Sequence, residues 1–135
     1  RDRSPSRGLG DVYKRQVRRL LDRYFTTAPD GIPGNDDTGT MSAWAVFSMM
    51  GLYPDCPGEP YYTLTSPVFD KVTVTLDPKY YPAGELVIET ERSGAGDVYI
   101  GSMTLGGRPL KKYRISHGEL VGGGRLVFGL QPERK

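Results

Sequence analysis

The spacing of apolar residues changes once along this chain, and that change limits the folds it can adopt. Before residue 53 apolar side chains recur at helical spacing, whereas from residue 61 they alternate at strand spacing. A Pro- and Gly-rich linker, residues 53–60, separates the two parts. We therefore expect two helices followed by about six short strands, which is an α+β order of elements.

The first part of the chain predicts two helices joined by a polar loop. Residues 17–27 place apolar side chains at intervals of three and four, as one helix face requires. These side chains are Val17, Leu20, Leu21, Tyr24 and Phe25. The stretch 41–50 is almost wholly apolar, which predicts a helix buried on most sides, and Gly51 stands where a C-cap glycine belongs. Two such helices cannot enclose a core alone, so we expect them to be the edge of a larger helical body.

The second part predicts strands separated by glycine-rich turns. Gly106-Gly107 and Gly122–Gly124 supply positions where a turn needs positive φ. The segments with strand-like alternation are residues 61–64, 71–76, 86–90, 98–100, 102–105 and 125–128. No segment has the run of about 18 apolar residues that a membrane span requires. The single cysteine, Cys56, excludes an internal disulfide and is interpreted as an incidental free thiol.

The net positive charge of the chain comes from its beginning. Residues 1–16 carry five basic and two acidic side chains, whereas the remaining 119 carry 13 and 14. A basic arm for nucleic acid or membrane lipid is one interpretation. We favour another, because Asp-Val-Tyr-Lys-Arg-Gln at residues 11–16 matches the translation of a transposon end used in sequencing libraries. Residues 1–16 are then a non-native leader, a sequencing-adapter scar, and no nucleic-acid partner is expected.

The loop Gly-Asn-Asp-Asp-Thr-Gly, residues 34–39, carries the side chains best suited to chemistry. Asp36 and Asp37 precede a predicted helix, whose dipole favours ionised carboxylates near its first turn. An ionised, oriented carboxylate is what a general base needs to take a proton from water, and adjacent residues cannot both face one substrate. From the residues alone, N-capping is preferred to catalysis, because Asp, Asn and Thr commonly precede helices. A calcium loop of the EF-hand type is excluded, since Val46 stands twelfth from Asn35 where that loop needs Glu.

Several segments, in this order and spacing, carry a resemblance to a known family. They are Asp-Gly-Ile-Pro-Gly-Asn-Asp-Asp at 30–37, Thr-Met-Ser-Ala-Trp at 40–44, Gly-Leu-Tyr-Pro at 51–54, Ser-Pro-Val-Phe-Asp-Lys-Val at 66–72, His-Gly-Glu-Leu at 117–120 and Gly-Gly-Arg-Leu-Val-Phe at 123–128. Residues 17–135 thereby resemble glycoside hydrolase family 92, the calcium-dependent exo-α-mannosidases. The resemblance implies an incomplete fragment. Residues 17–52 would be the last helices of an (α/α)6 barrel with the catalytic loop, and residues 53–135 an antiparallel, sandwich-like β domain.

The resemblance also implies roles for the loop residues. The last Asp of the family's Asn/Asp-x-Asp loop is its favoured general base, which corresponds to Asp37, with Asn35 and Asp36 in support. These enzymes invert the anomeric configuration, so a Glu acid would stand roughly 6.5–9.5 Å from the base. That acid and most ligands of the family's calcium would come from the chain upstream of Val17, and no metal ligand is assigned here. The family often has Gln where Thr40 stands, and the shorter Thr40 hydroxyl is the substrate contact expected at that position.

The remaining polar and aromatic candidates are interpreted as structural. His117 is expected to make a structural hydrogen bond at a strand end or turn, and not to be catalytic. Trp44 is assigned to the core in preference to a sugar-stacking platform. Packing on strand faces is preferred to a carbohydrate-binding surface for four tyrosines, namely Tyr61, Tyr62, Tyr80 and Tyr81.

The sequence therefore predicts the C-terminal part of a secreted or periplasmic, inverting exo-α-mannosidase that acts on terminal α-mannosides of glycans. Its partners would be a mannose-containing glycan and the upstream part of the same chain. The alternative is a non-catalytic β-sandwich module that binds carbohydrate or supports a neighbouring domain.

Overall fold

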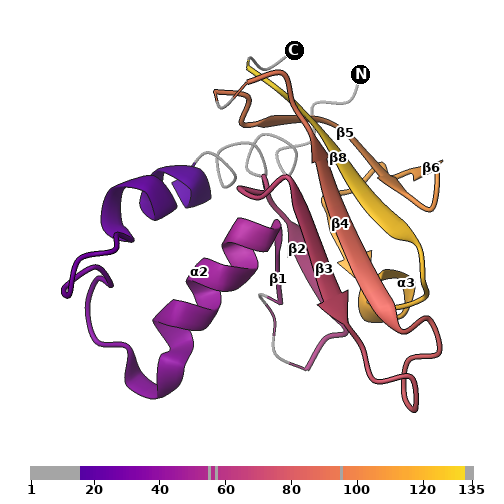
Figure 1. The fold of residues 1–135 in the computed structure, drawn as a ribbon, viewed down its shortest axis with the longest axis horizontal. Coiled ribbons are helices and arrows are strands. Elements are labelled where there is room, and N and C mark those ends of the chain that lie inside the picture. The colour runs from indigo at the N-terminus through magenta and orange to yellow at the C-terminus, as the bar shows by residue number, and fades with distance from the viewer. Residues whose placement is uncertain (1–15, 55, 57, 95, 133–135) are drawn as a thin grey trace.

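The computed structural model describes residues 16–54, 56, 58–94 and 96–132 (Figure 1). The expected leader lies outside these residues except for Gln16, which is the first described residue of a helix at residues 16–24. The later elements are η1 (Asp37–Gly39), α2 (Thr40–Met50), β1 (Leu52–Tyr53), β2 (Tyr61–Leu64), β3 (Lys71–Thr75), β4 (Glu85–Glu91), β5 (Tyr99–Leu105), β6 (Arg108–Pro109), β7 (Arg114–Ser116), α3 (His117–Leu120) and β8 (Arg125–Gln131).

The two predicted helices form, but α2 is less buried than its composition predicts. It ends as expected at Gly51, whose N–H donates to Phe47 O at 3.1 Å and Ser48 O at 3.2 Å with φ at +100°. Only Ala45 and Ser48 are buried, and Val46 is 53% exposed, so the prediction of a helix buried on most sides is wrong for this chain. The physical reason is that the helix at residues 16–24 and the edge of the sheets cover only part of its surface. No helix in the described part is long and apolar enough to cross a bilayer.

The strands form two sheets, with orders β1-β2-β7 and β3-β4-β8-β5-β6. Neighbouring strands run antiparallel except for β4 and β8, which pair in parallel from Val87 opposite Arg125 to Glu91 opposite Gly129. The prediction of an antiparallel β domain is therefore wrong for the pair β4 and β8 and holds for the other strand pairs. Because the chain passes through β5, β6, β7 and α3 between them, it re-enters the sheet from the end where β4 began.

The strand boundaries lie within one residue of the predicted segments at β2, β3 and β4, whereas β8 continues three residues past its predicted end at residue 128. The two segments predicted at 98–100 and 102–105 are one strand, β5, whose register shifts between Ile100 and Ser102. This shift is a β-bulge, and it interrupts the alternation of side chains, so the sequence predicts two strands where the structure has one. The two- and three-residue strands β1, β6 and β7 and the single-turn helix α3 were not predicted, because so few residues show no period.

The two sheets share one hydrophobic core, as expected for a sandwich-like domain. Leu52, Leu64 and Ile115 come from the three-stranded sheet, and they pack in one cluster with side chains of the five-stranded sheet, including Leu126 and Phe128. A smaller cluster joins the helix at residues 16–24 to α2. The described helices by themselves do not form an (α/α)6 barrel, so the barrel stays a prediction.

The segment 65–68 connects the C-terminal end of α2 to the sheets. Thr65 N–H donates to Gly51 O at 2.7 Å, and Val68 N–H donates to Met49 O at 2.9 Å. Side-chain packing is equally close, since a Cβ on Gly51 would lie 2.6 Å from Pro67 Cγ. Both contacts fix α2 at its C-terminal end, so its N-terminal loop projects away from the sheets (Figure 1).

Candidate active site

Asp36 provides the cap of α2 from outside the helix. Its Oδ1 accepts the N–H groups of Met41 at 2.7 Å and Ser42 at 3.2 Å, and its Oδ2 accepts the Ser42 hydroxyl at 2.5 Å. The Ser42 hydroxyl is the main reason that the pKa of Asp36 lies below its ordinary value, opposed by loss of hydration and aided by the two backbone donors. The capping alternative raised by the sequence therefore applies to Asp36.

Asp37 occupies the turn of η1, and its side chain is exposed. Its backbone oxygen accepts the hydroxyls of Thr38 at 2.7 Å and Thr40 at 3.2 Å. Within the described residues its carboxylate makes no hydrogen bond or ion pair. The two adjacent carboxylates thus differ, since that of Asp36 is occupied by the helix and that of Asp37 is open to water or a solute.

Thr38 lies between Asp37 and the start of α2, and its backbone is strained. Its φ is +56°, and it is the only non-glycine residue with positive φ in the described part of the chain. A β-branched residue in the left-handed region costs of order 1–3 kcal/mol, and such strain concentrates at functional sites. This conformation marks the loop as a candidate active site independently of its composition.

The other two predicted site residues also lie in this loop. Asn35 and Thr40 are exposed, and the Thr40 hydroxyl donates to the backbone of Asp37 beside that of Thr38. Local sequence therefore brings all four candidates to one loop, in which Asp36 alone is half-buried, and the roles in substrate binding stay predictions. Ser42 was missed as a site residue. The signal was its place in the Thr-Met-Ser-Ala-Trp motif, where a hydroxyl in the first helical turn can meet an upstream carboxylate.

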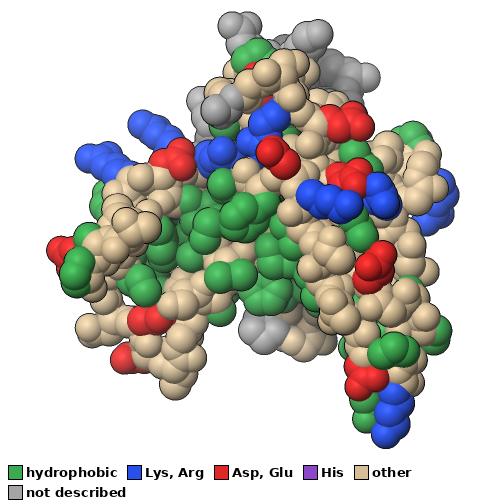
Figure 2. Space-filling view, viewed as in Figure 1, with side chains coloured by type: hydrophobic (Ala, Val, Ile, Leu, Met, Phe, Trp, Pro, Cys, Tyr) green, Lys and Arg blue, Asp and Glu red, His purple; other side chains and the backbone are tan. Residues whose placement is uncertain are grey.

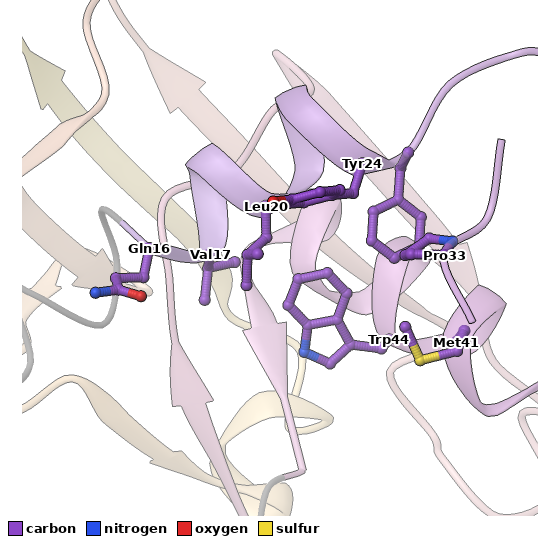
Figure 3. Close-up of a pocket in the computed structure, with 8 residues that line it drawn as sticks. Gln16, Val17, Leu20, Tyr24, Pro33, Met41 and Trp44 are labelled. Carbon is purple, nitrogen blue, oxygen red and sulfur yellow. The ribbon is translucent and has the colours of Figure 1, made fainter. Parts of the chain in front are cut away.

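An apolar pocket of about 580 Å³ lies beside the loop, between the helix at residues 16–24 and α2 (Figure 3). Leu20 and Tyr24 line it and are 41% and 47% exposed. Trp44 also lines it while packing against the small helical cluster, with its ring centroid 5.4 Å from that of Phe25. Trp44 thus packs against the helical cluster, but its side chain is only half-buried and not fully in a core. Figure 2 shows hydrophobic side chains gathered between the helical part and the sheets on the face viewed.

We expect the isolated chain to bind a hydrophobic dye in this pocket. Open apolar walls of this size mark interaction sites or aggregation-prone surfaces. Fluorescence of anilinonaphthalene sulfonate should rise on mixing with the chain, and Leu20→Glu should suppress most of that rise. Phe69→Glu, at an exposed apolar residue of the β part, is the matched control and should leave it unchanged. A monomeric chain that does not bind the dye would contradict an open pocket.

The described residues do not by themselves fit a calcium site. They contain no group of three or more His, Cys, Asp or Glu side chains close enough to hold a metal ion. Calcium takes six to eight oxygen ligands in proteins. Calcium therefore stays an implication of the family resemblance, and no chemical step is assigned to it here.

The structural interpretation of His117 fits its contacts. Its Nδ1 lies 3.0 Å from the Tyr62 hydroxyl and its Nε2 lies 3.4 Å from that of Tyr81. Tyr62 packs on β2 as expected. Tyr80 and Tyr81 lie in the connection between β3 and β4, so packing on a strand face is wrong for both, and Tyr80 is 67% exposed. Tyr61 is also partly exposed, beneath the Arg114 guanidinium at 4.0 Å from the ring centroid. Cys56 is an exposed free thiol, as predicted.

Comparison with known proteins places these features in a family context. The model of the glycosyl hydrolase family 92 catalytic domain matches residues 12–132. An uncharacterized secreted glycosidase of Arthroderma benhamiae is 34% identical over 109 residues, which are 81% of this chain and 14% of that protein.

Two solved structures from Bacteroides thetaiotaomicron superpose on most of the chain. One is a family GH92 inverting mannosidase, with 34% identity, a TM-score of 0.79 and coverage of 92% of this chain and 16% of that one. The other is a family GH92 α-mannosidase in complex with mannoimidazole, with 26% identity, a TM-score of 0.80 and coverage of 89% and 15%. The chain thus spans about one seventh of the length of these relatives.

Proposed function

The chain belongs to glycosyl hydrolase family 92, and from this premise we propose that it is the C-terminal part of an inverting exo-α-mannosidase that acts on terminal α-mannosides of glycans. The observation that carries the proposal is the match of residues 12–132 to the family's catalytic domain, joined to superposition on two mannosidases. Residues 17–52 would complete the catalytic barrel, and residues 53–135 would form the β domain beside it.

Asp37 is the proposed general base. In the inverting reaction, a water attacks the anomeric carbon while a base removes its proton and an acid protonates the leaving oxygen on the other face of the sugar. Asp37 suits the first task, because its carboxylate is exposed and makes no hydrogen bond or ion pair with the described residues. Asn35, which is exposed, would donate a hydrogen bond to a sugar hydroxyl, and the exposed Thr40 oxygen, whose own O–H is donated to Asp37 O, would accept one. Asp36 would support the loop from its position against α2.

The rest of the polypeptide is the proposed partner of the helical part. Because the chain spans about one seventh of its relatives, most of a family 92 protein lies outside it. That remainder would supply the acid and the calcium ligands, and it would cover the apolar pocket lined by Leu20 and Tyr24. A secreted or periplasmic location is proposed on the printed description of the fungal relative.

We expect the isolated 135-residue chain to have no mannosidase activity. One carboxylate cannot both protonate the leaving oxygen and activate water, and the acid is expected elsewhere in the polypeptide. Release of mannose from an aryl α-mannoside should be absent for the chain and present for the full-length protein, with β-mannose as the first product seen by NMR. Calcium-dependent release by the chain alone would contradict the missing acid. If instead residues 53–135 bind mannosides while the full-length protein is inactive, the function would be that of a binding module.

A further inference from the structure

We propose that Ser42 is a positioning residue for the candidate base: by binding Asp36 through two donors, it holds the loop so that the Asp37 carboxylate stays exposed at the turn of η1. This inference rests on the proposed function, since it names a residue that acts on the base through a neighbour. Nothing in the family match assigns a role to Ser42, and the argument rests on the geometry of the loop.

The Asp36 carboxylate is held by two consecutive residues of α2. Ser42 donates its hydroxyl to Oδ2 at 2.5 Å and its N–H to Oδ1 at 3.2 Å, and Met41 donates its N–H to Oδ1 at 2.7 Å. Both carboxylate oxygens are therefore engaged, and the Ser42 hydroxyl is the donor to Oδ2. A carboxylate gripped through both oxygens cannot rotate freely, so its backbone is fixed relative to the helix.

The backbone on the other side of Asp37 is fixed as well. The Asp37 carbonyl accepts the Thr38 and Thr40 hydroxyls, and Gly39 N–H donates to Asp36 O at 3.2 Å. Between these points Thr38 takes a φ of +56°, a conformation that persists only where its surroundings enforce it. The Asp37 carbonyl meets α2 at its first residue, Thr40, and the contacts of Asp36 extend the network further into α2, to Met41 and Ser42. Releasing it should let the turn relax and the Asp37 carboxylate move.

Ser48 on the same helix provides a matched control. It is fully buried, and its hydroxyl has no hydrogen-bond partner within the described residues. Ser42→Ala and Ser48→Ala remove the same atom from the same helix, but only the first removes a contact of the loop. A general effect on helix stability would appear in both variants, whereas a positioning effect would appear in Ser42→Ala alone.

The first test uses the 135-residue chain and does not depend on activity. Titration of the Asp36 carboxyl by NMR should give a higher pKa in Ser42→Ala than in the parent chain, with helix content unchanged by circular dichroism. Ser42→Thr, which keeps the hydroxyl, should restore the parent value, and Ser48→Ala should not change it. An unaltered Asp36 titration in Ser42→Ala would overturn the proposed grip. Ser42→Cys keeps the volume with a weaker donor, and it should shift the titration in the same direction if Ser42→Ala does not fold.

The second test uses the full-length enzyme. Ser42→Ala should lower kcat by about 10–10² with KM nearly unchanged, because misplacing a reacting group by about 1 Å costs on this scale. Ser42→Thr should recover most of the rate, and Ser48→Ala should retain it. A rise in KM with unchanged kcat would overturn the proposal in favour of direct substrate binding. If Ser42→Ala has wild-type kinetics while Asp37→Asn is inactive, the role of Ser42 is refuted and the assignment of the base is not. If both variants have wild-type kinetics, the assignment of Asp37 as the base is refuted as well.

Discussion

Asp37→Asn in the full-length enzyme is expected to lower turnover by roughly 10²–10⁴, the range that a positioned general base contributes. The amide has nearly the shape of the carboxylate but cannot accept a proton from water. Folding should be unaffected, because the Asp37 side chain makes no hydrogen bond or ion pair with the described residues. Steady-state kinetics on an α-mannoside, together with a thermal melt of the same preparation, measure both parts of the expectation.

The neighbouring carboxylate is the control for this variant. Asp36→Asn should cost much less activity, since an amide oxygen can still accept the N–H groups of Met41 and Ser42. The alanine variants should separate the two residues by stability. Asp36→Ala removes the cap of α2 and should destabilise the protein, whereas Asp37→Ala should not. A near wild-type rate in Asp37→Asn would refute its role as base, and equal losses at both residues would refute the division of roles between them.

The elements that the sequence predicts well are those with a long hydrophobic period. Lys71–Thr75 and Tyr61–Leu64 match the predicted segments within one residue, and α2 begins one residue earlier than expected. Burial of one face imposes such a period on any strand or helix of sufficient length. The parallel pairing of β4 with β8 could not be read in this way. It depends on a connection of more than thirty residues, and a strand's period is the same in either direction.

The position of the candidate site could be predicted, but the roles within it could not. The composition of residues 34–39 identified the loop, and the family resemblance favoured Asp37 over Asp36. What separates the two carboxylates physically is the left-handed Thr38 and the hydroxyl of Ser42, six residues after Asp36. Neither feature can be predicted from the conformational preference of the residue, because threonine disfavours positive φ and serine has no preference for such a contact within a helix. The motif places a hydroxyl in the first turn of the helix, and the structure adds that its partner is Asp36.

The sequence also indicates that apolar side chains of the helical part need a partner outside these two helices. The sequence predicts that the two helices are the edge of a larger helical body, and the structure leaves Leu20, Tyr24 and Val46 exposed. The β part differs, since two sheets enclose their own cluster of buried side chains. Stability of the isolated chain should therefore depend mainly on the core between the sheets, which leads to the second large effect that we expect.

Phe128→Ala is expected to destabilise the isolated chain by about 3–5 kcal/mol, the usual cost of emptying a large aromatic site in a core. Phe128 has no exposed surface, and it stands on β8 opposite Thr90 of β4 and Met103 of β5. It therefore lies on the central strand of the five-stranded sheet and packs in the core that the two sheets share. Because a domain is stable by only about 5–15 kcal/mol, such a loss would remove a large share of the free energy of unfolding. Urea unfolding followed by circular dichroism measures the change in midpoint.

Phe69→Ala is the matched control, because it removes the same side chain from a position that is 44% exposed. Its free energy of unfolding should stay within about 0.5 kcal/mol of the parent value, as is usual for surface substitutions. Phe128→Leu keeps an apolar side chain in the site and should lose less than Phe128→Ala, so the series remains measurable if the alanine variant does not fold. The order of losses follows from the cavity that each variant leaves between the two sheets. Equal losses at Phe69 and Phe128 would mean that β8 does not form the centre of the core.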